Sequence, residues 1–94
     1  FGEDLGRYFA LTSEMSVINL RISSCTDEDN AAPGRAQANW SSYRDLQQLT
    51  VKCIEAPQNL KFDIFWATSD NKKLFRDNSH AKNVLGYAPQ DGVR

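Results

Sequence analysis

The sequence has little of what marks several specialised classes of protein. Its 11 basic and 12 acidic side chains leave a formal net charge of −1, which gives no electrostatic reason to expect nucleic acid or an anionic membrane as a partner. No apolar run approaches the roughly 20 residues that a membrane-spanning helix needs. The glycines form neither G-x-G-x-x-G nor G-x-x-G-x-x-G, so the glycine-rich fingerprint of dinucleotide-binding domains is absent from these residues.

Cysteine and histidine are scarce as well. Cys25 and Cys53 are far apart in sequence, and His80 is the single histidine, so nothing stands at metal-ligand spacing and no metal site is predicted. A disulfide between the two cysteines is arithmetically available. The low cysteine content favours two reduced thiols in a cytoplasmic protein. The first ten residues lack a basic stretch followed by an apolar one, so we expect no signal peptide.

Hydrophobic periodicity predicts alternating helices and strands. Apolar residues at helical spacing indicate helices, and β-branched or alternating apolar residues indicate strands. The second helix has an N-cap in Ser41 or Ser42 and is ended by Pro57, while Gly86 stands where a left-handed C-cap closes the third. The predicted order is helix 1–13, strand 16–22, helix 43–56, strand 61–68 and helix 79–86.

The pattern also predicts which side chains are buried. The strand at 16–22 is almost continuously apolar, so we expect it to be buried on both faces. The strand at 61–68 alternates Phe62, Ile64 and Trp66, the period of an apolar strand face. The expected buried positions of the second helix are Leu46, Leu49, Val51 or Cys53, and Ile54.

Strands separated by helices predict an α/β fold with parallel pairing. Two parallel strands alone make a poor sheet, because both are edges with unpaired backbone groups. We therefore predict that the 94 residues are a single unit, part of a larger doubly wound, Rossmann-like parallel sheet. The unpaired edges also predict self-association.

The segment at 23–39 is long, polar and without a predicted element. Loops of this length within compact domains are usually functional or disordered. In an open α/β sheet, ligands bind outside the carboxyl ends of the strands, where this segment begins. It is therefore the first place to look for a binding site.

Five segments carry a family resemblance: FGEDLGRYFA, LRISSC, ANWSSYRDL, KCIEAP and DNSHAKNVLGYAPQDGVR. Together, and in this order, they resemble the C-terminal part of the extended short-chain dehydrogenases/reductases, an NAD-dependent epimerase/dehydratase family, with the strongest likeness to uronate dehydrogenases. The resemblance implies that residues 1–94 are one C-terminal, substrate-side fragment without the N-terminal dinucleotide-binding half. The catalytic Tyr-x-x-x-Lys would lie just before Phe1, so the chain is expected to be inactive alone and to hold no catalytic residue.

The resemblance also implies binding roles. Ser24 would offer its hydroxyl to the sugar, and Arg35, five residues before Trp40, would hold the substrate carboxylate. Ile22 and Cys25 would pass close to the nicotinamide of NAD. A planar guanidinium suits the carboxylate because it makes two parallel charge-assisted hydrogen bonds. Arg35 as a solvated loop residue, and Ser24 as a strand-end hydroxyl bonded to its own backbone, remain the alternatives.

Three functions remain open at this point. The first is oxidation of a hexuronate by NAD, with the chain as part of the enzyme. The second keeps the fold but epimerises or dehydrates a nucleotide sugar, which does not need a carboxylate clamp, so Arg35 separates the two. The third is a non-catalytic interaction or scaffold module, which the missing catalytic pair and glycine loop support.

Overall fold

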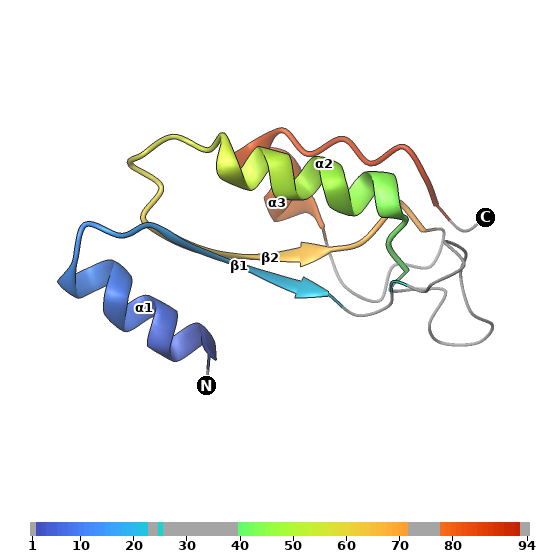
Figure 1. The fold of residues 1–94 in the computed structure, drawn as a ribbon. Coiled ribbons are helices and arrows are strands. Elements are labelled where there is room, and N and C mark those ends of the chain that lie inside the picture. Colours follow the sequence, from blue (N-terminus) through green and yellow to red (C-terminus); the bar gives the residue numbers. More distant parts are fainter. Residues whose placement is uncertain (1, 23–24, 26–39, 72–77, 93–94) are drawn as a thin grey trace.

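The computed structural model describes residues 2–22, 25, 40–71 and 78–92 (Figure 1). Its elements are α1 (Gly2–Thr12), β1 (Val17–Ile22), α2 (Tyr43–Ile54), β2 (Phe62–Ala67) and α3 (Ser79–Leu85). The strands pair in parallel, with Val17 opposite Phe62 and Ile22 opposite Ala67. The predicted order of elements and the parallel pairing are confirmed.

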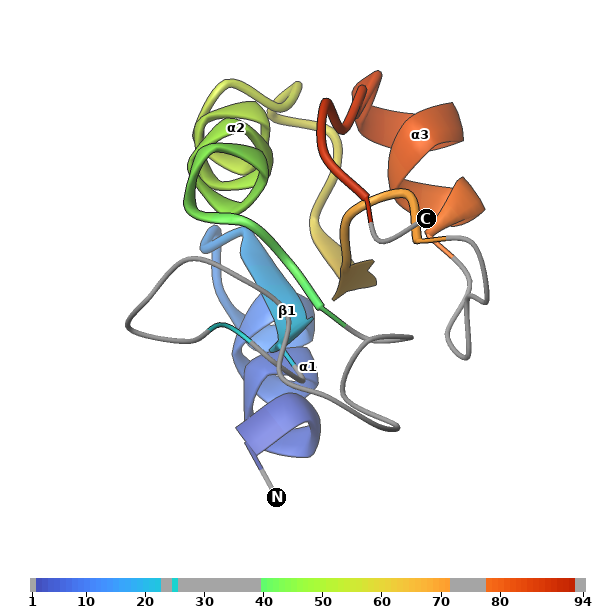
Figure 2. The ribbon, with the colours of Figure 1, turned by 90° about the vertical axis from the view of Figure 1, so that its right-hand side faces the viewer.

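The helices lie on both sides of this small sheet. Figure 1 shows α1 on one side and α2 and α3 on the other, and Figure 2 shows α3 on the β2 side of the molecule. The core lies between β2, α2, α3 and the segment after α3. It consists of Leu49, Phe65, Ala67, Ala81 and Tyr87.

The ends of α2 follow from its capping residues. Ser42 is the N-cap, and its hydroxyl accepts a hydrogen bond from the Asp45 amide at 3.2 Å. The last helical residue is Ile54, and Glu55 caps the helix two residues before Pro57, in keeping with the bias of the residue before proline away from helical backbone.

The predicted buried face of α2 is correct only in part. Leu49 is fully buried, and Leu46 and Cys53 pack against the same core. Val51 and Ile54 are 50% and 78% exposed. The prediction of burial is therefore wrong for Ile54. Of the two alternatives Val51 and Cys53, Cys53 is the one that packs against the core. Positions 46, 49 and 53 recur at helical spacing toward the sheet, whereas 51 and 54 fall on the adjacent stripe.

The predicted burial of the strands needs two corrections. β1 is half-buried from Val17 to Leu20 and exposed at Arg21 and Ile22, not buried on both faces. In β2 the fully buried residues are Phe65 and Ala67, while the alternating Phe62, Ile64 and Trp66 are half-buried. Both faces of β2 are apolar, and the face under α2 and α3 is the better covered.

Arg7 of α1 and Arg21 of β1 lie over aromatic rings on the less covered face of the sheet. The Arg7 guanidinium lies 4.9 Å from the centre of the Phe62 ring, and that of Arg21 lies 5.1 Å from the Trp66 ring. Arg21 also forms a two-pronged ion pair with Glu3 of α1 at 2.8 Å. The Arg21–Glu3 ion pair and the cation–π contact of Arg7 with Phe62 hold α1 against the sheet.

The third helix begins and ends as predicted. Gly86 has φ 71° and closes α3 in the left-handed conformation. Asn78 occupies the N-cap position, but its side chain makes no capping hydrogen bond. The side-chain amide of Asn78 donates instead to the Thr68 carbonyl and to Asp70 Oδ1. His80 is on the surface, with Nε2 2.7 Å from Asp63 Oδ1 and its ring stacked on Phe65.

Three further observations concern the cysteines, possible metal ligands and possible membrane-spanning helices. Cys25 and Cys53 are both free thiols. Within residues 2–22, 25, 40–71 and 78–92, no cluster of histidine, cysteine and carboxylate side chains could hold a metal ion. None of the three helices in this part of the chain has the length and apolarity to cross a membrane.

Candidate substrate-side site at the carboxyl edge of the sheet

The carboxyl ends of β1 and β2 meet at one edge, because the strands are parallel. Ile22 is the last residue of β1 and is exposed there, and Cys25 lies just beyond it, half-buried. These are the two residues that sequence reasoning assigned to cofactor contact. Ser24 and Arg35, assigned to the substrate, lie outside the described residues.

A fully buried carboxylate organises the β2 side of this edge. Asp45, in the first turn of α2, is 0% exposed. Its Oδ2 accepts hydrogen bonds from the Ser69 hydroxyl at 2.6 Å and the Asp91 amide at 3.0 Å, and its Oδ1 accepts one from the Gln90 amide at 2.7 Å. A carboxylate is tolerated inside a protein only when it is satisfied in this way. Asp45 therefore ties α2 to the end of β2 and to the segment after α3.

A second carboxylate fastens the same segment from outside. Asp91 Oδ2 accepts from the Ser42 hydroxyl at 2.6 Å and from Arg44 Nε at 2.7 Å, while Oδ1 accepts from Arg44 Nη2 at 2.7 Å. The Arg44 guanidinium, with help from the Ser42 hydroxyl, holds the pKa of Asp91 below its ordinary value of 3.8.

This arrangement predicts an acid-sensitive contribution to stability. A carboxyl group whose pKa is lowered by folding stabilises the folded state above its ordinary pKa and loses that effect as the pH falls toward the lowered value. We expect Asp91→Asn to be less stable than the parent at about pH 6, with the difference shrinking from about pH 4 downward. Urea unfolding across this range checks the prediction. A difference that stays constant with pH would contradict it.

The segment 87–92 is also held close to β2 by its own backbone. The Asp70 amide donates to the Asp91 carbonyl at 2.9 Å, and a Cβ at Gly92 would collide with the Asp70 carbonyl. Farther from this end, the Gln48 side chain pairs with both backbone groups of Ala88 at 2.8 and 2.7 Å. Glycine is thus needed at position 92 for the close approach.

The residues just after β2 complete the edge. The Ser69 amide and the Asn71 side chain both donate to the Trp40 carbonyl, at 2.9 and 3.0 Å. The Thr68 carbonyl accepts from the Tyr87 hydroxyl at 2.9 Å. Burial, together with nearby carboxylates, raises the pKa of Tyr87, so this phenol stays protonated and is unsuited to be a catalytic base.

Two buried polar atoms at this edge, Trp40 Nε1 and Thr68 Oγ1, have no hydrogen-bond partner within the described part of the chain. Trp40 is buried, with 8% of its surface exposed. A buried donor without a hydrogen-bond partner destabilises the folded state until a polar group bonds to it. The edge is therefore a hydrogen-bonded platform that joins α2, the end of β2 and the segment after α3.

Sequence reasoning missed the central role of Asp45. The sequence indicates only an acid in the first turn of a helix, where carboxylates interact favourably with the helix dipole. One indication was present: Asp45 precedes the buried Leu49 by four positions, so both lie on one face of α2. Ser69 and Asp91 carried no such indication.

No protein-family model matches the chain. Among curated proteins, it is 41% identical over 91 residues to the NAD-dependent glucose-6-phosphate dehydrogenase of Haloferax volcanii, covering 96% of this chain. Among solved structures, it is 34% identical to uronate dehydrogenase from Agrobacterium tumefaciens, with a TM-score of 0.83 over 98% of this chain. Glucuronic acid dehydrogenase from Chromohalobacter salexigens is 32% identical, with a TM-score of 0.82.

The match covers only part of each relative. The chain spans 34% of the Haloferax protein and 33% of each of the two solved chains. A TM-score above 0.8 over nearly all of the described fold shows that this third keeps its arrangement in the longer chains. In sequence and in fold, the chain is similar to a segment that makes up about one third of the length of each of these NAD-dependent sugar and uronate dehydrogenases.

Proposed function

We propose that the chain forms the substrate-side part of an NAD-dependent sugar dehydrogenase that oxidises a hexuronate. The observation that carries the proposal is the similarity over 98% of the chain to uronate dehydrogenase. The dehydrogenases among the relatives favour oxidation over epimerisation or dehydration of a nucleotide sugar.

Four residues have a role in this proposal. The Ser24 hydroxyl bonds the sugar, and the Arg35 guanidinium pairs with its carboxylate through two parallel hydrogen bonds. Ile22 and Cys25 contact the nicotinamide end of NAD, chiefly through backbone groups. A hydride passes from C1 of the hexuronate to NAD, a proton passes to a base outside these residues, and an aldarolactone results.

One relative favours a second substrate class. The Haloferax protein is a glucose-6-phosphate dehydrogenase and is 41% identical to this chain. Its substrate carries a phosphate at the sugar carbon where a uronate carries a carboxylate. A guanidinium binds both anions through the same two-pronged geometry, so Arg35 serves either substrate.

We expect the purified 94-residue chain to produce no NADH from any uronate or sugar phosphate and to bind NAD weakly. The glycine-rich phosphate loop and a Tyr-x-x-x-Lys pair are both absent from the sequence. NADH fluorescence in the presence of chain, NAD and sugar measures this, with Agrobacterium uronate dehydrogenase as the active control. NADH formation above the protein-free rate would contradict the expectation.

A chimera tests the proposal itself. This chain replaces the matching third of Agrobacterium uronate dehydrogenase, and the ratio of kcat/KM for glucuronate and glucose-6-phosphate is measured. Oxidation of either anionic sugar supports the proposal, and the ratio names the class. A folded chimera that binds NAD but oxidises neither would favour the non-catalytic scaffold.

A further inference from the structure

A short turn after β2, residues 69–71, bonds to the chain just beyond the polar segment 23–39. We propose that this turn, here called the anchor turn, fixes the end of that segment and that Asn71 is a positioning residue for the anionic sugar. The inference rests on the proposed function for the substrate-binding role of the segment. Its evidence is the set of hydrogen bonds that the anchor turn makes to residues 40–42.

The Trp40 carbonyl is held by two donors of the anchor turn. It accepts from the Ser69 amide at 2.9 Å and from Asn71 Nδ2 at 3.0 Å. The Asn71 amide donates to the Ser69 carbonyl at 3.0 Å, so the backbone curls and the Asn71 side chain reaches back to Trp40. All three residues are buried. A carbonyl bonded twice by buried donors is fixed in position, because moving it would leave those donors unsatisfied.

The anchor turn also holds the chain at Ser42. The Ser42 amide donates to the Ser69 hydroxyl at 3.0 Å, and that hydroxyl donates to Asp45 Oδ2 at 2.6 Å. Ser42 is buried as well and is the N-cap of α2. Residues 40–42 are therefore held between the anchor turn and the beginning of α2.

Both ends of the segment 23–39 are fixed at one place in the sheet. Ile22, just before the segment, pairs with Ala67 of β2. Trp40, just after it, is bonded to Ser69. The chain thus leaves the carboxyl edge beside Ala67 and returns to it beside Ser69. Segments whose two ends lie close together in this way are frequently functional.

The two fixed ends are near in sequence to the residues proposed to bind the sugar. Ser24 follows Ile22 by two positions, and Arg35 precedes Trp40 by five. Five residues span at most about 17 Å, so the position of Trp40 limits where Arg35 can be held. Loosening Trp40 would give the segment more conformations to lose when it binds a substrate. The effect should therefore appear in substrate binding and not in the chemical step.

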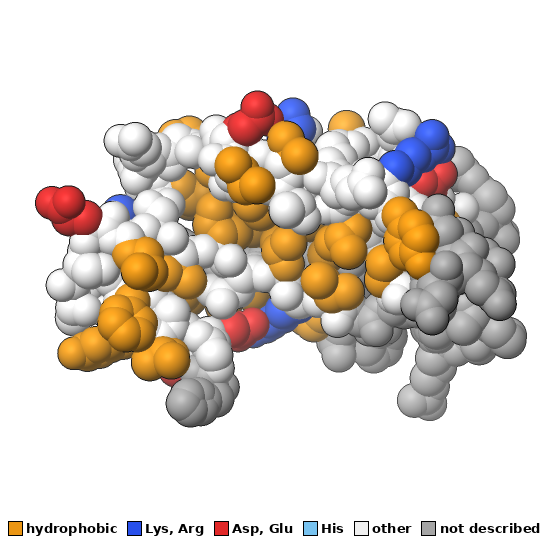
Figure 3. Space-filling view, in the orientation of Figure 1, with side chains coloured by type: hydrophobic (Ala, Val, Ile, Leu, Met, Phe, Trp, Pro, Cys, Tyr) orange, Lys and Arg blue, Asp and Glu red, His pale blue; other side chains and the backbone are white. Residues whose placement is uncertain are grey.

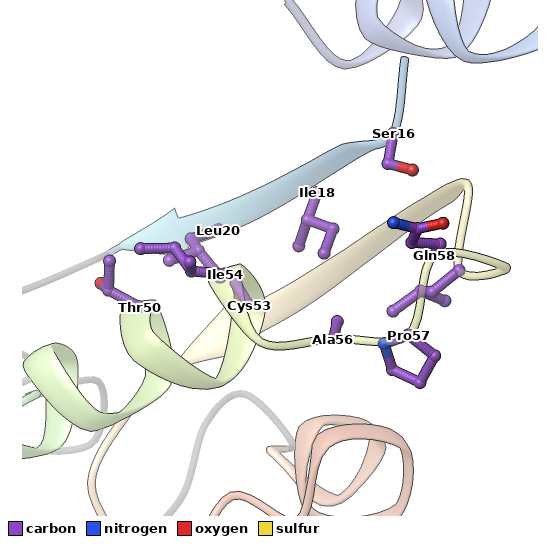
Figure 4. Close-up of a pocket in the computed structure, with 10 residues that line it drawn as sticks. Ser16, Ile18, Leu20, Thr50, Cys53, Ile54, Ala56, Pro57 and Gln58 are labelled. Atoms are coloured by element: carbon purple, nitrogen blue, oxygen red, sulfur yellow. The ribbon is translucent and has the colours of Figure 1, made fainter. Parts of the chain in front are cut away.

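The apolar surfaces of the molecule do not suit an anionic sugar. Figure 3 shows hydrophobic side chains gathered over α1, over α2 and along the strip between them. A groove of about 470 Å³ lies between β1, the end of α2 and the loop that follows (Figure 4). Its described lining includes Ile18, Leu20 and Leu60 and holds no lysine or arginine. A carboxylate or phosphate would lose its hydration there without gaining a partner.

Hydrogen exchange in the purified chain tests the anchor turn without any need for activity. In Asn71→Ala, the Trp40 carbonyl loses one of its two donors, and we expect the Ser69 amide to exchange about tenfold faster or more. Asn78→Ala is the matched control, because Asn78 is also buried and its side chain bonds to the Thr68 carbonyl. In that variant the Ser69 amide should stay within about threefold of the parent rate. If Asn71→Ala does not fold, the milder Asn71→Ser is measured in its place.

The chimera with Agrobacterium uronate dehydrogenase tests the positioning role. Asn71→Ala should raise KM for the anionic sugar about tenfold or more and change kcat by less than about threefold. A neutral hexose makes no use of Arg35, so its KM should change by no more than about threefold. In an Arg35→Ala background, Asn71→Ala should add little, because both residues act on one contact. Asn78→Ala should leave KM within about threefold of the parent.

The two measurements separate the possible failures. Unchanged exchange of the Ser69 amide in Asn71→Ala would overturn the anchor. Faster exchange with an unaltered KM, or a KM that rises equally for the anionic sugar and the neutral hexose, would overturn the positioning role. A parent chimera that oxidises no sugar counts against the proposed function, and the exchange rates then decide by themselves whether the anchor turn fixes residues 40–42.

Discussion

Replacing Asp45 with alanine is expected to destabilise the chain by about 3–5 kcal/mol. The substitution leaves three donors without this acceptor: the buried Ser69 hydroxyl and the part-buried backbone amides of Gln90 and Asp91. Each unsatisfied donor costs about 1–3 kcal/mol, and the whole stability of a domain is only about 5–15 kcal/mol. We expect the loss of stability to be greatest at the carboxyl edge, because α2, β2 and the segment after α3 meet at the Asp45 carboxylate.

Urea unfolding of the parent and variant chains measures the effect. Asp45→Asn keeps the shape but turns an NH₂ group toward donors, so it should cost about 2 kcal/mol or more. Asp4→Ala is the matched control, at an exposed aspartate in the first turn of α1, and should cost less than about 1 kcal/mol. A chain that fails to fold is the limiting case of the expected loss. An Asp45→Ala variant as stable as the control would show that the network is not needed.

The types and order of the elements could be predicted from the sequence because each rests on local chemistry. Ser42 begins α2 by bonding the Asp45 amide three residues on, and Gly86 ends α3 because it tolerates a positive φ. The period of the apolar residues distinguishes helix from strand over the same short range. None of these features depends on a distant part of the chain.

Burial could be predicted less well because it depends on what each face meets. In β2 both faces are apolar, and alternation identifies two faces without saying which one α2 and α3 cover. Phe65 and Ala67 are fully buried and Phe62 is not, a result set by helix packing. Ile54 completes an apolar pattern yet is 78% exposed, because the described residues leave that side of α2 largely uncovered.

The platform at the carboxyl edge was beyond prediction for the same reason. Asp45 bonds to the Gln90 amide 45 positions away in sequence, and no local pattern joins the two. The substrate roles of Ser24 and Arg35 rest on family resemblance. They stay predictions, because both residues lie outside the described part of the chain.

Arg35 carries the second large effect that we expect, in the chimera with Agrobacterium uronate dehydrogenase. If Arg35 holds the substrate carboxylate, Arg35→Ala should lower kcat/KM for a uronate by about 30- to 1000-fold, the equivalent of about 2–4 kcal/mol. Arg35→Lys should lower it nearly as much. An ammonium group is a point charge and cannot make the two parallel hydrogen bonds of a guanidinium.

The substrate provides the control for this pair of variants. A neutral hexose of the same shape makes no use of the charge, so its slow oxidation should change by no more than a few-fold in either variant. Glucose-6-phosphate should follow the uronate if the site takes phosphate, since both anions bind the same fork of donors. Equal handling of the uronate by the arginine, lysine and alanine forms would make Arg35 a solvated loop residue. The anion would then be held by another group, and the polar segment at 23–39 would need a different function.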